Sequence, residues 1–131
     1  MASLTEYPVH LGQGARAEPQ PRFTGMEWYA DYVRRTATDG PEGRLVSLHR
    51  FDTPWDSWEM HPLGDELVVC TAGRITLIQA GEDGGETRQT LAAGDYAINP
   101  PGCWHTADIA PGESASVLFL TAGLGTQHRP R

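Results

Sequence analysis

Between residues 44 and 122, short apolar segments alternate with turns rich in glycine and proline, and this pattern constrains the fold more than any other feature of the sequence. Short apolar runs bounded by such turns are typical of β-strands, and several in succession indicate an antiparallel barrel or jelly roll. The expected strands cover residues 45–51, 55–61, 66–71, 74–80, 86–91, 96–99, 103–109 and 114–122. The sequence therefore predicts an all-β domain.

The two ends of the chain lack this strand pattern. Residues 1–22 mix glycine, proline and glutamine without periodicity and are expected to form an arm. Thr24 and Glu27 have the spacing of a capping box. The apolar side chains that follow recur at helical spacing, which predicts a short helix ending near Arg35. We therefore divide the chain into an N-terminal arm with its helix (1–43), a β-barrel (44–122) and a C-terminal tail (123–131).

The composition sets limits on the partners and the compartment. A chain of 131 residues suits one domain with a modest core. A net charge of −7 with no basic cluster argues against a nucleic-acid or anionic-membrane partner. The sequence shows no apolar run of about 18 residues and no basic-then-apolar leader, so neither a membrane span nor a secretory signal is expected. Only Cys70 and Cys103 are cysteines, too few for a disulfide scaffold. These features predict a reduced, cytoplasmic protein.

Four residues that can bind a metal lie around two corners of the chain. Glu59 and His61 are two residues apart, so on a strand their side chains point to the same face. Residues 62–65 predict a corner, because they include a proline and a glycine. Glu66 can then return a carboxylate to the face of His61, and His105 follows a second such turn. Carboxylate and imidazole groups that converge in this way are typical of a divalent metal site.

The order and spacing of these residues resemble the two conserved motifs of the cupin superfamily, in the form of a small single-domain bacterial-type cupin. The first motif runs from His61 through Glu66 to Gly73, and the second runs from Gly94 to His105. The resemblance covers the β-barrel region. It implies a cupin-like double-stranded β-helix, or jelly-roll barrel, in which His61, Glu66 and His105 bind one metal ion.

Three positions depart from the cupin pattern. Glu59 stands where the first motif usually has a histidine, Thr53 where it has a glycine, and Ile109 where the second motif often ends in asparagine. Glu59 is therefore either a further metal ligand or a general base beside the metal. A third alternative is a structural salt bridge from Glu59 to an arginine. For the cluster as a whole, the alternative is a hydrogen-bonded polar group without a metal.

The cofactor implied by the resemblance is one divalent metal ion. Two imidazoles and one carboxylate suit Fe(II), and Zn, Mn, Ni and Co are also compatible, so the sequence does not choose among them. If Glu59 binds as well, two carboxylates bring the formal charge of the site to about zero, whereas three imidazoles and one carboxylate leave about +1.

Strand alternation also predicts which side chains line the barrel interior. The expected pocket residues are Cys103, Cys70, Trp55 and His49. Small buried thiols that line a cavity are commoner than thiolate ligands or a redox pair. The two histidines outside the barrel region, His10 and His128, are expected to be exposed.

The function that these observations favour is a metal-dependent enzyme acting on a small organic molecule. Cupins perform oxygenation, including dioxygenase reactions, and non-redox isomerase, epimerase or lyase reactions, and the resemblance implies either type. Because fold does not fix function, the alternative is a non-catalytic small-molecule binder or sensor that uses the same cavity. A barrel of this size exposes strand edges, so we also expect a homodimer.

Overall fold

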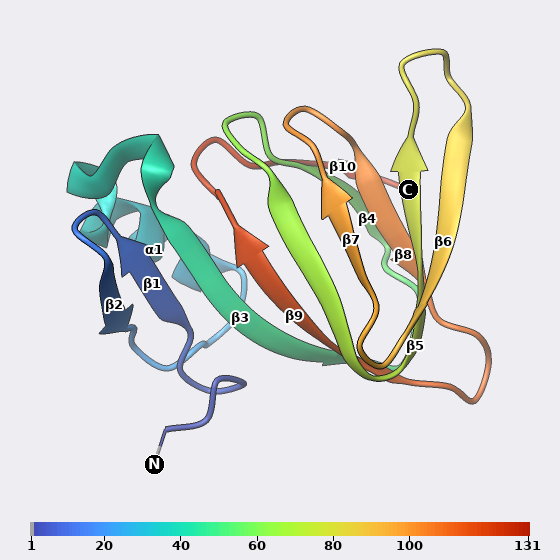
Figure 1. Ribbon diagram of the computed structural model, residues 1–131, viewed down its shortest axis with the longest axis horizontal. Coiled ribbons are helices and arrows are strands. Elements are labelled where there is room, and N and C mark those ends of the chain that lie inside the picture. The colour runs from blue at the N-terminus through green and yellow to red at the C-terminus, as the bar shows by residue number, and fades with distance from the viewer. Residues whose placement is uncertain (1) are drawn as a thin grey trace.

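The computed structural model describes residues 2–131 and consists mainly of strands (Figure 1). Its helical elements are α1 (Glu27–Arg35) and the 3-10 helix η1 (Ala37–Glu42). The strands are β1 (Val9–Gly12), β2 (Arg16–Pro19), β3 (Arg44–Phe51), β4 (Ser57–Met60), β5 (Glu66–Ala80), β6 (Glu86–Ala92), β7 (Tyr96–Asn99), β8 (His105–Asp108), β9 (Ala115–Thr121) and β10 (Gln127–Pro130). The prediction of an all-β fold with a short N-terminal helix is confirmed. Over the same described residues, neither helical element is long and apolar enough to cross a membrane.

The strands form two sheets that share the long strand β5. The first sheet has the order β2-β1-β3-β9-β5-β7, and the second has the order β10-β4-β8-β5-β6. The strand pairs are antiparallel in both sheets. In Figure 1, β5 runs down the middle of the molecule and curls at its lower end into the second sheet.

Strand β5 changes sheets at Gly73. Residues 66–73 pair with β9, with a register shift just before Gly73, and residues 74–80 pair with β6. Gly73 has a φ of +73°, and a Cβ there would lie 1.9 Å from the carbonyl oxygen of Ser114. Only glycine fits this conformation and this close approach. The sequence predicted a turn between two strands here. The structure has a bend within one strand, because both halves stay hydrogen-bonded to neighbouring strands.

Apolar side chains fill the space between the two sheets. Burial alternates along β5 and β9, as it does in strands with one face toward a core. The main core cluster contains Val68, Cys70, Ile75, Leu77, Leu91, Ala97, Ala107, Ile109, Ala115, Val117 and Phe119. A smaller cluster under α1 contains Trp28, Tyr32 and Leu45. Since Leu45 belongs to β3, this second cluster fixes the helix to the first sheet.

Helix α1 packs through an apolar face, as its periodicity predicted. Trp28 and Tyr32 are buried, and their rings stack with centroids 5.4 Å apart. The predicted capping box is wrong, because Met26 rather than Thr24 occupies the N-cap position and no side chain caps the helix. Gly25, with a φ of +135°, separates Thr24 from the first helical turn.

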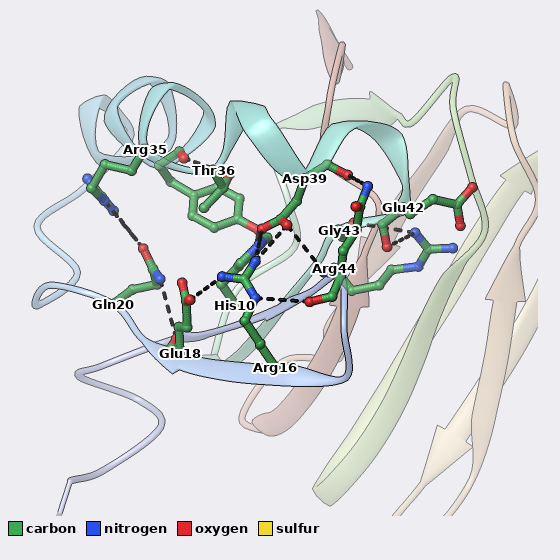
Figure 2. Close-up of polar contacts among 12 residues, drawn as sticks. His10, Arg16, Glu18, Gln20, Arg35, Thr36, Asp39, Glu42, Gly43 and Arg44 are labelled. Atoms are coloured by element: carbon green, nitrogen blue, oxygen red, sulfur yellow. Dashed lines mark hydrogen bonds and ion pairs between the residues drawn. The ribbon is translucent and has the colours of Figure 1, made fainter.

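The N-terminal segment is part of the first sheet. Strand β1 pairs with β3 on one side and with β2 on the other. His10 is only 1% exposed; its Nδ1 lies 2.7 Å from the hydroxyl of Tyr32 and its Nε2 lies 2.7 Å from a carboxylate oxygen of Asp39 (Figure 2). Arg16 also contacts Asp39, at 2.6 Å. The prediction that His10 is exposed is wrong, because β1 places its ring between α1 and η1, where both nitrogens have partners.

The C-terminal segment forms a strand on the edge of β4. In this β10 strand, His128 pairs across the ladder with Glu59. The four residues of β10 are exposed, and the guanidinium of Arg129 lies 4.3 Å from the ring centroid of Trp104. The segment expected to be a tail is therefore held by backbone pairing and by a cation–π contact, and it brings His128 to Glu59.

The bend at Gly73 yields a stability prediction. Gly73→Ala should lower the free energy of unfolding by about 3 kcal/mol, because the new methyl group must displace backbone at Ser114. The matched control is Gly94→Ala, which shares a positive φ of +93° but has no atom within 4 Å of the added Cβ. It should cost only about 1 kcal/mol, for the left-handed backbone alone. Equal losses in urea denaturation would show that the close approach at Gly73 is unimportant.

Candidate metal centre

Four side chains meet at one point between the two sheets. They are Glu59 on β4, His61 in the corner after β4, Glu66 at the start of β5 and His105 at the start of β8. One nitrogen or carboxylate oxygen from each residue lies within 4.8 Å of the others. The structure thus brings together the four residues that the sequence placed at a metal site.

Strand pairing explains why these side chains converge. Glu59 and His105 are direct partners across the ladder between β4 and β8. Alternation along β4 then puts His61 on the same side as Glu59. The corner that follows is fixed by the backbone N–H of Gly102, which donates to the carbonyl of His61 at 2.9 Å. The turn that precedes His105 therefore holds the turn that carries His61.

The two imidazoles face the two carboxylates at short range. Nε2 of His61 lies 2.8 Å from Oε1 of Glu59 and 3.1 Å from Oε2 of Glu66. Nε2 of His105 lies 3.3 Å from Oε1 of Glu66. Both Nε2 atoms are nevertheless buried without a hydrogen bond of acceptable geometry. Buried polar atoms without a partner are rare in folded proteins, so these two nitrogens require a further explanation.

The other ring nitrogen of each histidine has a defined partner. Nδ1 of His105 donates to the carbonyl of Cys103 at 3.2 Å. Nδ1 of His61 lies 2.7 Å from the hydroxyl of Thr126, which itself donates to the carbonyl of Gly123 at 2.7 Å and so accepts from the ring. Both rings therefore carry a proton on Nδ1, and Nε2 is the nitrogen that each ring directs at the centre. Metal-binding histidines are oriented in this way.

Glu66 is held more firmly than Glu59. Its Oε1 accepts from the side-chain amide of Asn99 at 3.0 Å, and its Oε2 accepts from the hydroxyl of Thr121 at 2.6 Å. The Glu66 side chain is 2% exposed, whereas that of Glu59 is 26% exposed. Glu66 is thus a fixed carboxylate, and Glu59 is the carboxylate that a molecule in solution can reach.

These residues fit a divalent metal ion. A cation between the rings would give each orphaned Nε2 a partner and would neutralise the two carboxylates. Two imidazole nitrogens and one or two carboxylate oxygens would hold it, and no side chain would have to move to a different strand or face.

The electrostatics of the cluster agree with this fit. Burial alone would lower the pKa of His61, but its contacts with Glu59 and Glu66 outweigh burial and raise the pKa to about 9. Burial would raise the pKa of Glu59, but its contacts with His128 and His61 hold it well below its usual range. The centre therefore favours positive charge strongly.

His128 is a site residue that the sequence analysis missed. Its Nε2 lies 3.4 Å from Oε2 of Glu59, the oxygen that His61 does not contact. The signal that could have found it is weak, because the strand Gln-His-Arg-Pro is polar throughout and no apolar alternation marks it. The supporting residues Asn99, Thr121 and Thr126 were missed for a similar reason: they act through the neighbours they support.

A cavity of about 900 Å³ adjoins the centre. Glu59, His61 and Glu66 form part of its wall, and Trp55 and His49 line it as the sequence predicted. Helix α1 and the segment before it supply another part of the wall, so the cavity lies between the helix and the inner face of the first sheet.

Neither cysteine is among the residues that line this cavity, contrary to the sequence prediction. Cys70 does point inward, but it is fully buried within the main core cluster, and its sulfur faces the carbonyl of Ala72 at 3.4 Å. Cys103 lies near the carbonyl of Ala80, at 3.8 Å. Strand alternation predicted the correct face for Cys70, but it does not predict how far along the barrel a side chain lies. Both thiols are free.

The chain is similar in fold to solved structures. No protein-family model and no curated protein matches it. Oxalate oxidase in complex with the substrate analogue glycolate matches with a TM-score of 0.56 and 14% identity, over 64% of this chain and 45% of that chain. Hydroxypropylphosphonic acid epoxidase from S. wedmorenis in complex with fosfomycin matches with a TM-score of 0.51 and 16% identity, over 60% of this chain and 43% of that chain.

A cobalt(II) form of HppE in complex with its substrate also matches, with a TM-score of 0.50 and 17% identity, over 60% of this chain and 44% of that chain. The present chain thus spans less than half the length of each of these three proteins. At such low sequence identity, these matches show similarity of the fold alone.

The geometry predicts which histidines the protein needs in order to bind metal. His61→Ala and His105→Ala should each weaken Zn²⁺ binding by more than about 100-fold, because each removes one Nε2 donor, a larger loss than removal of a supporting residue. The matched control is His49→Ala, which changes a cavity histidine outside the cluster and should bind like wild type. Calorimetry gives the affinities, and circular dichroism checks that all three variants fold. Similar losses in the three variants would contradict the assignment.

Proposed function

Because the chain has a cupin fold, we propose that it is a metal-dependent enzyme that acts on a small organic molecule in the cavity beside the centre. The proposed ligands are Glu59, His61, Glu66 and His105. The observation that carries the proposal is the pair of buried Nε2 atoms of His61 and His105, both directed at carboxylates and both without a hydrogen bond.

A metal at this position would supply a Lewis-acidic centre with coordination positions open toward the cavity. Oxygenation and a non-redox isomerase, epimerase or lyase reaction both use such a centre. The names of the similar structures, an oxidase and an epoxidase, support the oxidative type. With two carboxylates in place of one, the formal charge of the loaded site is about zero, so bound water would be acidified less than at a three-histidine site.

The two carboxylates have different proposed roles. Glu66, with both oxygens hydrogen-bonded, serves as an anchoring ligand. Glu59 would bind the metal through Oε1, the oxygen that faces His61, while His128 contacts Oε2. His128 is thus a positioning residue: its side chain is 41% exposed, so it can also exchange protons between Glu59 and solvent. In this arrangement Glu59 and His128 connect the cavity to the outside of the barrel.

Metal content tests the proposal most directly. Protein purified without a histidine tag or chelators should contain about one divalent ion per chain, because one cluster of suitable donors occurs among the described residues. Elemental analysis identifies the ion. If Fe, Zn, Mn and Ni all fail to bind on reconstitution, the proposal is wrong. Ligand binding by loaded protein without turnover would instead indicate a binder or sensor.

One substitution distinguishes the possible roles of Glu59 as a metal ligand or as a general base. Glu59→Gln keeps the volume but removes the charge, and it should weaken metal binding by about 10-fold or more, since one charged donor is lost. Glu86→Gln, on the exposed strand β6, is the matched control and should change nothing. Unchanged metal affinity with lost turnover would make Glu59 a general base instead, and no change in either property would remove it from the site.

We also propose that the chain forms a homodimer. Strand β7 has β5 as its single strand partner among the described residues. On this edge Tyr96 and Ile98 are 63% and 50% exposed. An exposed apolar edge strand favours pairing with another strand. Light scattering should give about twice the chain mass of 14.3 kDa, and Ile98→Lys should return the mass to that of one chain. A wild-type mass near 14.3 kDa would exclude the dimer.

A further inference from the structure

The wall of the cavity contains a group of aromatic side chains that contact one another. The rings of Phe51 and Trp55 are 5.5 Å apart, and Phe119 lies 6.1 Å from each of them. Phe23, from the segment before α1, lies 5.2 Å from His49 and extends this wall. The ring of Trp55 in turn lies 6.2 Å from that of His105. A continuous series of rings therefore leads from the outer part of the cavity to the metal centre.

Among the residues that the structure describes, no lysine or arginine lines this cavity. The charged side chains in its wall, apart from histidine, are the acidic groups of Asp56, Glu59 and Glu66. Burial lowers the pKa of His49, so its ring is neutral at neutral pH. Burial together with Glu59 and Glu66 raises the pKa of Tyr29 to about 12, so its hydroxyl keeps its proton. The two histidines of the wall that favour a positive charge, His61 and His128, are already in contact with Glu59, and His61 also contacts Glu66. An anion in this cavity would therefore meet no positive side chain that is free of an acidic partner.

The arginines of the chain all lie outside the cavity wall. The sequence contains ten arginines and no lysine. The arginines that pair with acidic groups are Arg16, Arg22, Arg34, Arg50, Arg88 and Arg131. Neither these arginines nor their acidic partners line the cavity. A metal in the centre would not change this balance, because Glu59 and Glu66 already cancel the charge of a divalent ion.

Two buried polar atoms in the wall have no partner. They are Nε2 of His49 and Nε1 of Trp55. The indole N–H can only donate a hydrogen bond, and an imidazole nitrogen can donate or accept. Leaving such atoms unpaired is costly, so a molecule that fills the cavity gains affinity if it offers an oxygen acceptor to them.

We infer that the cavity selects an uncharged molecule with an aromatic or cyclic hydrocarbon body and an oxygen acceptor such as a carbonyl or hydroxyl group, and that it rejects carboxylates and other anions. This inference rests on the proposed function for the role of the site, but the selectivity is a property of the cavity wall. A volume of about 900 Å³ admits a body of two or three fused rings.

A pair of probes that differ in charge and not in shape tests the inference. 2-Naphthamide and 2-naphthoate are titrated at pH 7.5 into Zn²⁺-loaded protein, with metal content measured separately. The amide should bind at least about tenfold more tightly, because the carboxylate must be desolvated without a positive partner. Equal binding, tighter binding of naphthoate or no binding of either probe overturns the inference, whatever the metal analysis shows.

Titration of the same two probes into the His105→Ala variant separates this inference from the proposed function. His105 is not among the residues that line the cavity, so this variant loses metal but keeps the wall, and the preference for the amide should persist. Loss of the preference in the variant would assign the selectivity to the metal and overturn the inference. A preference that persists while wild type binds no metal would leave the inference standing and remove the proposed function.

Substitutions in the wall sharpen the test. Trp55→Phe keeps an aromatic ring but removes the N–H. It should weaken the binding of 2-naphthamide by about fivefold, which is the effect of one hydrogen bond. Trp58→Phe, outside the cavity, should have no effect. Ala30→Arg places a cation at the cavity wall and should reduce the preference for the amide by at least about fivefold, whereas Ala93→Arg adds the same charge elsewhere and should not. Equal effects within either pair would contradict the assignment of the wall.

Discussion

A single backbone contact, between Gly73 and the carbonyl of Ser114, determines how the two sheets are arranged. It lets β5 turn through a sharp bend without losing its neighbours, so that one half of the strand lies in each sheet. The half that begins with Glu66 pairs with β9, and the other half pairs with β8, which begins at His105. The distance between these two metal-site residues is therefore set by the geometry of one bent strand.

The sequence predicted the parts of this structure that leave a periodic or motif signal. Glu59, His61, Glu66 and His105 could be placed together because alternation fixes a face and the turns fix where the chain returns. The strands β1 and β10 could not be foreseen in this way. β10 is exposed along its length and is held by backbone hydrogen bonds, which leave no pattern in the side chains. The burial of His10 depends on Tyr32 and Asp39, 22 and 29 residues away, and no local pattern encodes such a contact.

Charge is distributed unevenly between the interior and the surface of this molecule. Most of the ion-paired arginines contact exposed acids, and Arg16 contacts the buried Asp39. Glu59 and Glu66 instead meet at the candidate metal centre, with histidines as their partners. Two carboxylates so close together are stable only with a counter-charge, which is a proton on His61 in the absence of metal and the metal ion when it is bound. The same accumulation of acids would attract a cation and would leave the adjoining cavity without attraction for anions. The proposed cation binding and the proposed selectivity of the cavity thus share one electrostatic origin.

The strand β10 has a consequence for how such a site can change in evolution. Thr126 and His128, which orient His61 and Glu59, lie on a short exposed segment that crosses the edge of the barrel and contributes nothing to the main core cluster. Substitutions there carry little penalty for folding, yet each alters the orientation or basicity of a group at the centre. Chains that share this fold can therefore vary the surroundings of the candidate metal centre through the β10 segment while the four residues of the centre and the core stay fixed. The same segment is a natural position at which to begin directed evolution of the site.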